Sequence, residues 1–175
     1  MKAILMSIRP QWVEKILNGE KTIEVRKRFP KDYVGWVYIY CTMNGGCIAK
    51  SKNKYVYYQK GYTTRSGKVV ARFWCDKVED YVYGHKWSWE NGAPMWGADN
   101  SYEKILKDMC LTDDELKTYV DDLCFSAIHI TKLEIFDKPK EIYEMKRLKH
   151  FGIRNKCEML VPITSAPQNY CYIEL

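Results

Sequence analysis

One short segment carries the clearest structural signal in this sequence: Gly19-Glu20-Lys21-Thr22-Ile23-Glu24-Val25-Arg26-Lys27-Arg28. Within it, Ile23 and Val25 alternate with polar residues, which is the period of a strand with one buried face. We expect the opposite face of this strand to be polar and to carry Thr22, Glu24, Arg26 and Arg28. Lys21 stands in the turn before the strand, where strict alternation does not apply.

The charges of this segment allow two interpretations. One carboxylate among several cations can fix ion pairs, bind an anion or transfer protons. The alternative is a solvated strand face with cross-strand ion pairs, which is common on antiparallel sheets. The sequence alone leaves both open.

The elements before this segment predict where its polar residues lie. Residues 3–8 have the pattern of a strand, and residues 10–18 that of a short amphipathic helix with Pro10 in its first turn and Gly19 at its end. Sequential strands are usually neighbours, so the polar residues beside the helix should converge. We therefore expect one concave pocket lined by Ser7, Arg9, Trp12, Lys21, Glu24 and Arg26.

The same residues resemble a known family. Gly19, Lys21, Glu24 and Arg26 match the G-x-K-x-x-E-x-R signature of ASCH domains, members of the PUA-like superfamily. Residues 7–12, 128–139 and 166–172 resemble the flanking strands of a longer form associated with prophages and bacterial genomes. The resemblance covers both ends of the chain well and residues 45–123 poorly, so this middle part looks like an insertion.

Composition predicts one globular domain spanning residues 1–175. The chain is 46% hydrophobic and 29% charged, as in ordinary soluble domains, and long enough to bury a core. Its seven cysteines form no C-x-x-C pair and no secreted framework, which favours a reducing cytoplasm. No stretch reaches the ~20 apolar residues of a membrane span, so we expect no membrane partner. The oligomeric state is not predicted.

Charge is distributed unevenly. Residues 1–72 hold 15 Lys and Arg against 4 Asp and Glu, whereas residues 73–175 hold 13 against 18. A basic half favours a polyanion such as nucleic acid. Within it, residues 47–67 interleave lysines with tyrosines, which suits a single-stranded nucleic acid. A hairpin with one packed aromatic face and one solvated lysine face explains the same pattern.

The remaining segments predict an α+β fold. We expect strands at residues 35–43, 68–83, 127–136 and 170–174, and helices at 101–109, at 112–123 and from Pro139. Thr112 and Glu115 have the spacing of a capping box at the start of the second helix. Residues 146–155 read as a basic connection. About six strands with short flanking helices favour a small β-barrel, the pseudobarrel that the PUA-like resemblance also implies.

No cofactor or metal is expected. The three histidines lie far apart, at positions 85, 129 and 150, and none pairs closely with a cysteine, whereas a zinc site needs ligands at paired spacing. No glycine-rich nucleotide-binding motif is present.

The resemblance implies two functions. The first is a nucleic-acid-binding module, for RNA or single strands, in which Arg9, Lys21, Arg26 and Arg28 contact phosphate and Trp12 or a loop aromatic stacks a base. The second is a small amidohydrolase of acetylated cytidine-type nucleosides, in which Lys21 activates water or attacks the amide and Glu24 shuttles the proton.

The enzymatic alternative carries a specific difficulty. Its signature has Thr where this chain has Glu24, and a carboxylate raises the pKa of a neighbouring lysine. A third possibility is a protein-interaction module that uses the tryptophans of residues 85–100, namely Trp87, Trp89 and Trp96.

Overall fold

The computed structural model describes residues 2–82, 102–121, 124–151 and 157–175. The loop of residues 85–100, and with it the interaction module based on its tryptophans, lies outside the described residues. The described chain divides into two compact units that interleave in sequence. Residues 1–18, 35–74 and 132–175 form unit 1, and residues 19–34 and 75–131 form unit 2. The expectation of a single domain stays a prediction.

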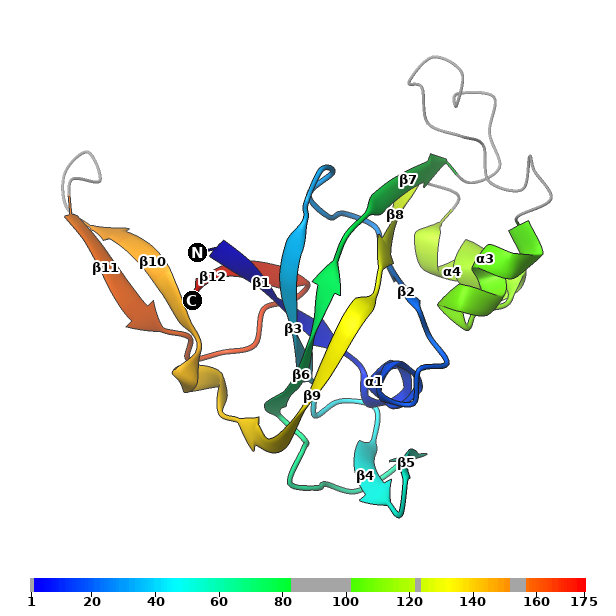
Figure 1. Cartoon of the computed structure of the whole chain (residues 1–175), viewed down its shortest axis with the longest axis horizontal. Helices are drawn as coiled ribbons and strands as arrows, with labels where there is room; N and C mark the ends of the chain where they lie inside the picture. Colours follow the sequence, from blue (N-terminus) through cyan, green and yellow to red (C-terminus); the bar gives the residue numbers. More distant parts are fainter. Residues whose placement is uncertain (1, 83–101, 122–123, 152–156) are drawn as a thin grey trace. The chain divides into compact units, whose positions relative to one another are not determined.

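Unit 1 is built on a seven-stranded sheet in the order β11-β10-β12-β1-β3-β6-β9 (Figure 1). Its strands are β1 Lys2–Ile8, β3 Gly35–Cys41, β6 Lys68–Cys75, β9 Thr131–Lys140, β10 Lys146–Phe151, β11 Cys157–Pro162 and β12 Tyr170–Glu174. The central strand β1 pairs antiparallel with β12 and parallel with β3. One face of this sheet buries the apolar residues Ala3, Leu5, Tyr38, Tyr40, Val69 and Ile173, together with Met145 and Ile163.

Unit 1 also contains the helix α1 (Pro10–Leu17) and a two-stranded sheet of β4 (Cys47–Ser51) and β5 (Lys54–Tyr58). Pro10 occupies the first turn of α1, where no backbone donor is needed. The chain leaves the helix through Gly19 at a φ of 74°, the left-handed region that glycine tolerates best. The helix packs against both strands of the β4–β5 hairpin.

Unit 2 contains a three-stranded antiparallel sheet in the order β2-β8-β7 and two helices. The elements are β2 Ile23–Arg26, β7 Val78–Val82, α3 Tyr102–Met109, α4 Asp113–Val120 and β8 Cys124–His129. The expected capping box forms, because the Thr112 side chain accepts from the Glu115 amide while the Glu115 carboxylate accepts from the Thr112 amide.

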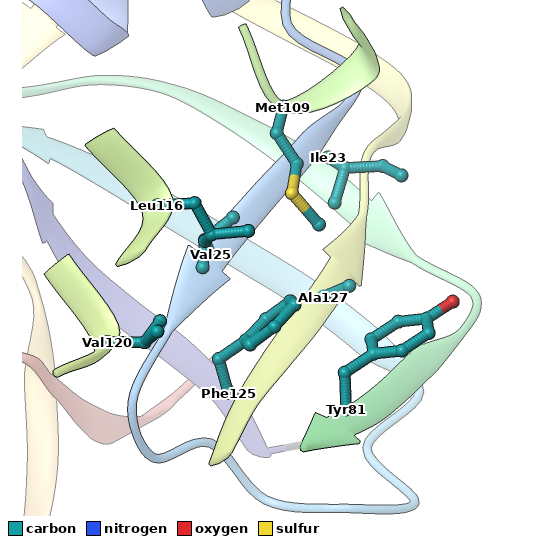
Figure 2. Close-up of a cluster of buried hydrophobic side chains, with 8 residues drawn as sticks. All are labelled: Ile23, Val25, Tyr81, Met109, Leu116, Val120, Phe125 and Ala127. Carbon is teal, nitrogen blue, oxygen red and sulfur yellow. The ribbon is translucent and has the colours of Figure 1, made fainter. Parts of the chain in front are cut away.

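The apolar face of this sheet is closed by the two helices (Figure 2). Residues alternate along each strand, so Ile23, Val25, Tyr81, Phe125 and Ala127 share one face, where they meet Met109, Leu116 and Val120 from the helices. The rings of Tyr81 and Phe125 stack with their centroids 5.4 Å apart. The prediction that Ile23 and Val25 face a core is confirmed.

The α+β class is confirmed, but a closed barrel is not. The described part of the chain holds twelve strands rather than about six, arranged in three sheets with open ends. The count differs because β4, β5, β10 and β11 add four strands and because two expected long strands are each divided. Residues 68–83 form β6 and β7 in different sheets, and residues 127–136 belong to β8 and β9. Only Asp76 and Lys77 separate β6 from β7, and only Ile130 separates β8 from β9, so the chain changes sheet with little interruption of the strand pattern.

The expectations for two shorter segments are also wrong. The helix expected from Pro139 is a three-residue 3-10 turn, Ile142–Glu144, because β9 continues to Lys140. The basic connection expected from residue 146 begins as strand β10, which pairs with β11 and β12. The sequence did not predict this strand, because charged side chains on a partly exposed strand weaken the apolar alternation that identifies a strand.

Candidate functional site

The polar face of the unit 2 sheet gathers charged and hydroxyl side chains from three strands. In the antiparallel register Arg26 lies opposite Ser126, and Ser126 lies opposite Asp80. Glu24 lies two residues before Arg26 and therefore on the same face. These residues stand on the opposite side of the sheet from the apolar cluster of Figure 2.

Lys21 is held at the start of β2 by the end of helix α3. Its Nζ donates to the carbonyl oxygen of Met109, the last residue of α3, at 2.6 Å. The backbone amide of Thr22 donates to the carbonyl of Asp108 at 2.9 Å. Carbonyls at a helix C-terminus lack partners within the helix and carry partial negative charge, so they favour a cation.

Glu24 lies between the two cations. Its carboxylate is 3.6 Å from Nζ of Lys21 and 3.0 Å from an Nη of Arg26. The side chains of Lys21, Glu24 and Arg26 are only 3%, 7% and 12% exposed. The alternative of a solvated strand face is therefore wrong for this cluster. We call Lys21, Glu24 and Arg26 the buried ion cluster.

Burial dominates the protonation of Lys21. Removal from water lowers the pKa of Lys21 below its usual value, although Glu24 and Cys110 act to raise it and Arg26 acts to lower it further. The expected effect of the neighbouring carboxylate is present, because Glu24 acts to raise the pKa of Lys21, but it does not set the net direction. The Coulombic effect has the expected sign, but the desolvation of a nearly inaccessible ammonium outweighs it.

Sequence reasoning missed Ser126 and Asp80. The Ser126 hydroxyl is buried and donates to a carboxylate oxygen of Asp80 at 2.6 Å. Ser126 escaped notice because the strand was expected to begin one residue later, and Asp80 because its strand was joined to the preceding one. Neither residue stands in a motif, so only the strand register identifies them.

The other predicted site residues are Ser7, Arg9, Trp12 and Arg28. Ser7, Arg9 and Trp12 belong to unit 1, and the Ser7 hydroxyl donates to the Pro167 carbonyl at 2.6 Å. Arg28 is exposed beyond the end of β2. The pocket argument assumed that β1 and β2 are neighbouring strands. That assumption is wrong, because the two strands belong to different sheets, and the shared pocket stays a prediction.

Across the described ranges, no three His, Cys, Asp or Glu side chains are grouped so that they could hold a metal ion. Among the helices in those ranges, none has the length and apolar character needed to span a bilayer.

Comparison with solved structures identifies the fold. The chain is similar to an ASCH protein from Zymomonas mobilis, with a TM-score of 0.57 and 13% sequence identity over 98% of this chain and 87% of that chain. Two single-substitution variants of that protein align with TM-scores of 0.54 and 0.55 at 15% and 14% identity. No protein-family model and no curated protein matches the sequence.

The ASCH resemblance expected from the sequence is thus confirmed at the level of the fold. The likeness extends over nearly the whole chain, including residues 45–123, which the signature and its flanks left unassigned. Identity this low carries no information about ligand or reaction, so function rests on the site itself.

Proposed function

We propose that this protein is an ASCH module that binds nucleic acid by taking up one nucleotide or base of RNA or another single strand at the buried ion cluster. The observation that supports this is that Glu24 forms ion pairs with both Lys21 and Arg26, which fix the positions of the two cations. Cations held in place before a ligand arrives lose little conformational entropy on binding.

The donors and acceptors of the cluster suit a nucleotide. A guanidinium and an ammonium donate to phosphate or base carbonyl oxygens, and a carboxylate accepts from an exocyclic amine. Ser126 adds a hydroxyl on the same sheet face as Arg26. Because these groups are almost inaccessible, the cluster favours one inserted group over a row of backbone phosphates.

The test compares two arginines that each pair with a glutamate, one in the buried ion cluster and one at a more exposed position. Arg26→Gln removes the cluster's guanidinium, and Arg72→Gln removes one that pairs with Glu134 at 2.7 Å in unit 1. Binding of a fluorescent single-stranded RNA is measured by anisotropy, with circular dichroism to verify folding. We expect Arg26→Gln to weaken binding about tenfold, the loss of one charge-assisted hydrogen bond, and Arg72→Gln to leave it unchanged. Equal effects, or no binding by the unaltered protein, would contradict the proposal.

A second candidate function is the hydrolysis of an acetylated cytidine-type nucleoside. The lowered pKa of Lys21 favours it, because only the neutral amine can accept a proton. Neutral Lys21 would take a proton from water as the hydroxide adds to the acetyl carbonyl. Glu24 would pass that proton to the leaving nitrogen as the C–N bond breaks, which yields acetate and the free nucleoside.

Chromatography of N4-acetylcytidine incubated with the protein tests this reaction. We expect turnover that rises with pH as Lys21 deprotonates, and none with Lys21→Met. Lys21→Arg, which keeps the charge but cannot lose a proton at these pH values, should bind and fail to hydrolyse. Absence of turnover by the unaltered protein removes this candidate and leaves the binding proposal standing.

A further inference from the structure

Unit 1 carries an exposed basic hairpin that the buried ion cluster does not use. It comprises residues 47–62, which include β4, β5 and the segment that follows, and we call it the lysine hairpin. Its four lysines are all exposed: Lys50, Lys52, Lys54 and Lys60. None of these ammonium groups forms an ion pair with any residue in the described part of the chain.

Neighbouring cations of the same unit behave differently. Lys68 pairs with Glu141 at 2.6 Å, and Arg72 with Glu134 at 2.7 Å. Both carboxylates come from distant parts of the chain, because residues 33–75 contain seven Lys and Arg and no Asp or Glu. The hairpin lysines therefore have no acidic residue near them in sequence, and their charge is available to a partner.

Two tyrosines accompany these charges. Tyr58 is 48% exposed and Tyr62 is 79% exposed. Lys54 and Tyr58 lie four residues apart on β5 and so project from the same face of that strand. A lysine and an open aromatic ring on one face can contact a phosphate and a base of the same strand.

The hairpin is firmly attached to its unit. The side chain of Asn18 both donates to the carbonyl and accepts from the amide of Tyr55, each at 2.9 Å, and thereby satisfies the backbone of β5. The Thr63 hydroxyl donates to the Ile48 carbonyl at 2.6 Å, and the Ile48 side chain is fully buried. The lysines and tyrosines are thus displayed on an ordered support rather than on a free loop.

We propose that the lysine hairpin is a docking surface for single-stranded nucleic acid, with the lysines on phosphates and Tyr58 and Tyr62 stacked on bases. Lysines without ion pairs beside exposed tyrosine rings support this occupant over an acidic peptide. An acidic peptide would pair with the lysines but would have no bases to stack on the rings. This surface shares no residue with the buried ion cluster and does not require that the proposed function there be correct.

The charge is tested with two quadruple variants of equal net charge. The first replaces Lys50, Lys52, Lys54 and Lys60 by Gln, and the control replaces the exposed lysines Lys104, Lys107, Lys117 and Lys138 by Gln. Binding of a labelled oligouridine of about 12 nucleotides, within the usual site size, is measured by anisotropy across a salt series.

We expect the hairpin variant to lose most of the salt dependence. Each phosphate contact contributes about −0.7 to the slope of log affinity against log salt, so four contacts contribute about −2.8. Between about 50 and 200 mM salt, the unaltered protein should lose about 50-fold more affinity than the hairpin variant. The control variant should keep the full slope. Equal slopes for the two variants would show that net charge alone acts and would overturn the proposal.

The rings are tested separately by Tyr58→Ala with Tyr62→Ala. Stacking contributes no counterion release, so we expect a loss of affinity of about tenfold or more at an unchanged salt slope. Oligoglutamate that binds as tightly as oligouridine, or duplex RNA that binds more tightly, would overturn the choice of a single strand. If Arg26→Gln leaves binding intact while the hairpin variants weaken it, the hairpin stands and the function proposed for the buried cluster fails.

Discussion

Two groups of lysines in this protein face opposite physical conditions. Lys21 is almost inaccessible and contacts a carboxylate and a helix-terminal carbonyl. The four lysines of the hairpin are exposed and have no ion pair within the described ranges. The same side chain therefore has a perturbed protonation equilibrium at the buried place and lies in contact with solvent at the other.

The comparison shows that position, not residue type, determines what a lysine contributes. A buried ammonium requires fixed partners and can exist in its neutral form, which suits recognition of one chemical group or proton transfer. An exposed ammonium contributes long-range attraction that salt screens. A protein that holds both kinds can attract a polyanion at one surface and recognise a single group at another.

The largest effect should come from Glu24→Gln. This change leaves Lys21 and Arg26 buried without their shared counter-charge, and removal of one partner from a buried ion pair costs about 3 kcal/mol. Urea unfolding measures it. Glu134→Gln is the control, because Glu134 pairs with Arg72 at an exposed position and should cost less than about 1 kcal/mol. Similar losses in both variants would mean that the buried cluster has no special electrostatic role.

The next effect should come from Asn18→Ala. The change removes both hydrogen bonds between the Asn18 side chain and the backbone of Tyr55, and we expect a loss of about 1–2 kcal/mol. Asn53→Ala, in the exposed turn of the hairpin, serves as the control and should be neutral. If Asn18→Ala is also neutral in urea unfolding, the hairpin is not anchored by this contact.

How far the sequence predicted these regions depends on the range of the interactions. The α1 boundaries followed from Pro10 and Gly19, and the capping box from Thr112 and Glu115, because each signal acts within a few residues. The proximity of Lys21, Glu24 and Arg26 was also local. Their burial was not, since it depends on helices and strands about a hundred residues away.

The sequence failed mainly to predict which strands belong to the same sheet. An alternating pattern identifies a strand but not its partners, and nothing in residues 68–83 signals that the chain passes from one sheet to another. The pairing of Ser126 with Asp80 and the separation of β1 from β2 both arise from long-range register. These features set the surroundings of the buried ion cluster, which is why its location was predictable and its neighbours were not.

A smaller effect, dependent on pH, should distinguish Lys21 from other lysines. Because the pKa of Lys21 is lower in the folded than in the unfolded protein, the unfolded state binds more protons between those two values. The free energy of unfolding therefore gains from Lys21 as pH rises toward the usual lysine value of about 10.5. The Lys21→Met variant should lack this increase in the free energy of unfolding.

Urea unfolding of both proteins from about pH 7 to about pH 10 measures this effect. Burial also raises the pKa of Cys75 to about 11 and that of Cys41 to about 12, which lowers stability as pH rises, but both thiols are common to the two proteins. Near pH 7 the loss in Lys21→Met should be smaller than in Glu24→Gln, because Glu24 keeps Arg26 as a partner when Lys21 is replaced. A difference that does not change with pH would mean that Lys21 titrates normally.

The smallest effect on stability should come from the exposed group of lysines. The four hairpin lysines lie within eleven residues and carry the same charge, so they repel one another in the folded protein. Their replacement by Gln should change the free energy of unfolding by less than about 0.5 kcal/mol per site, in the stabilising direction at low salt. The gain should disappear as salt shortens the screening length to about 3 Å at 1 M. A loss of stability that persists at high salt would mean that these side chains are structural, and the contrast with Lys21 would then fail.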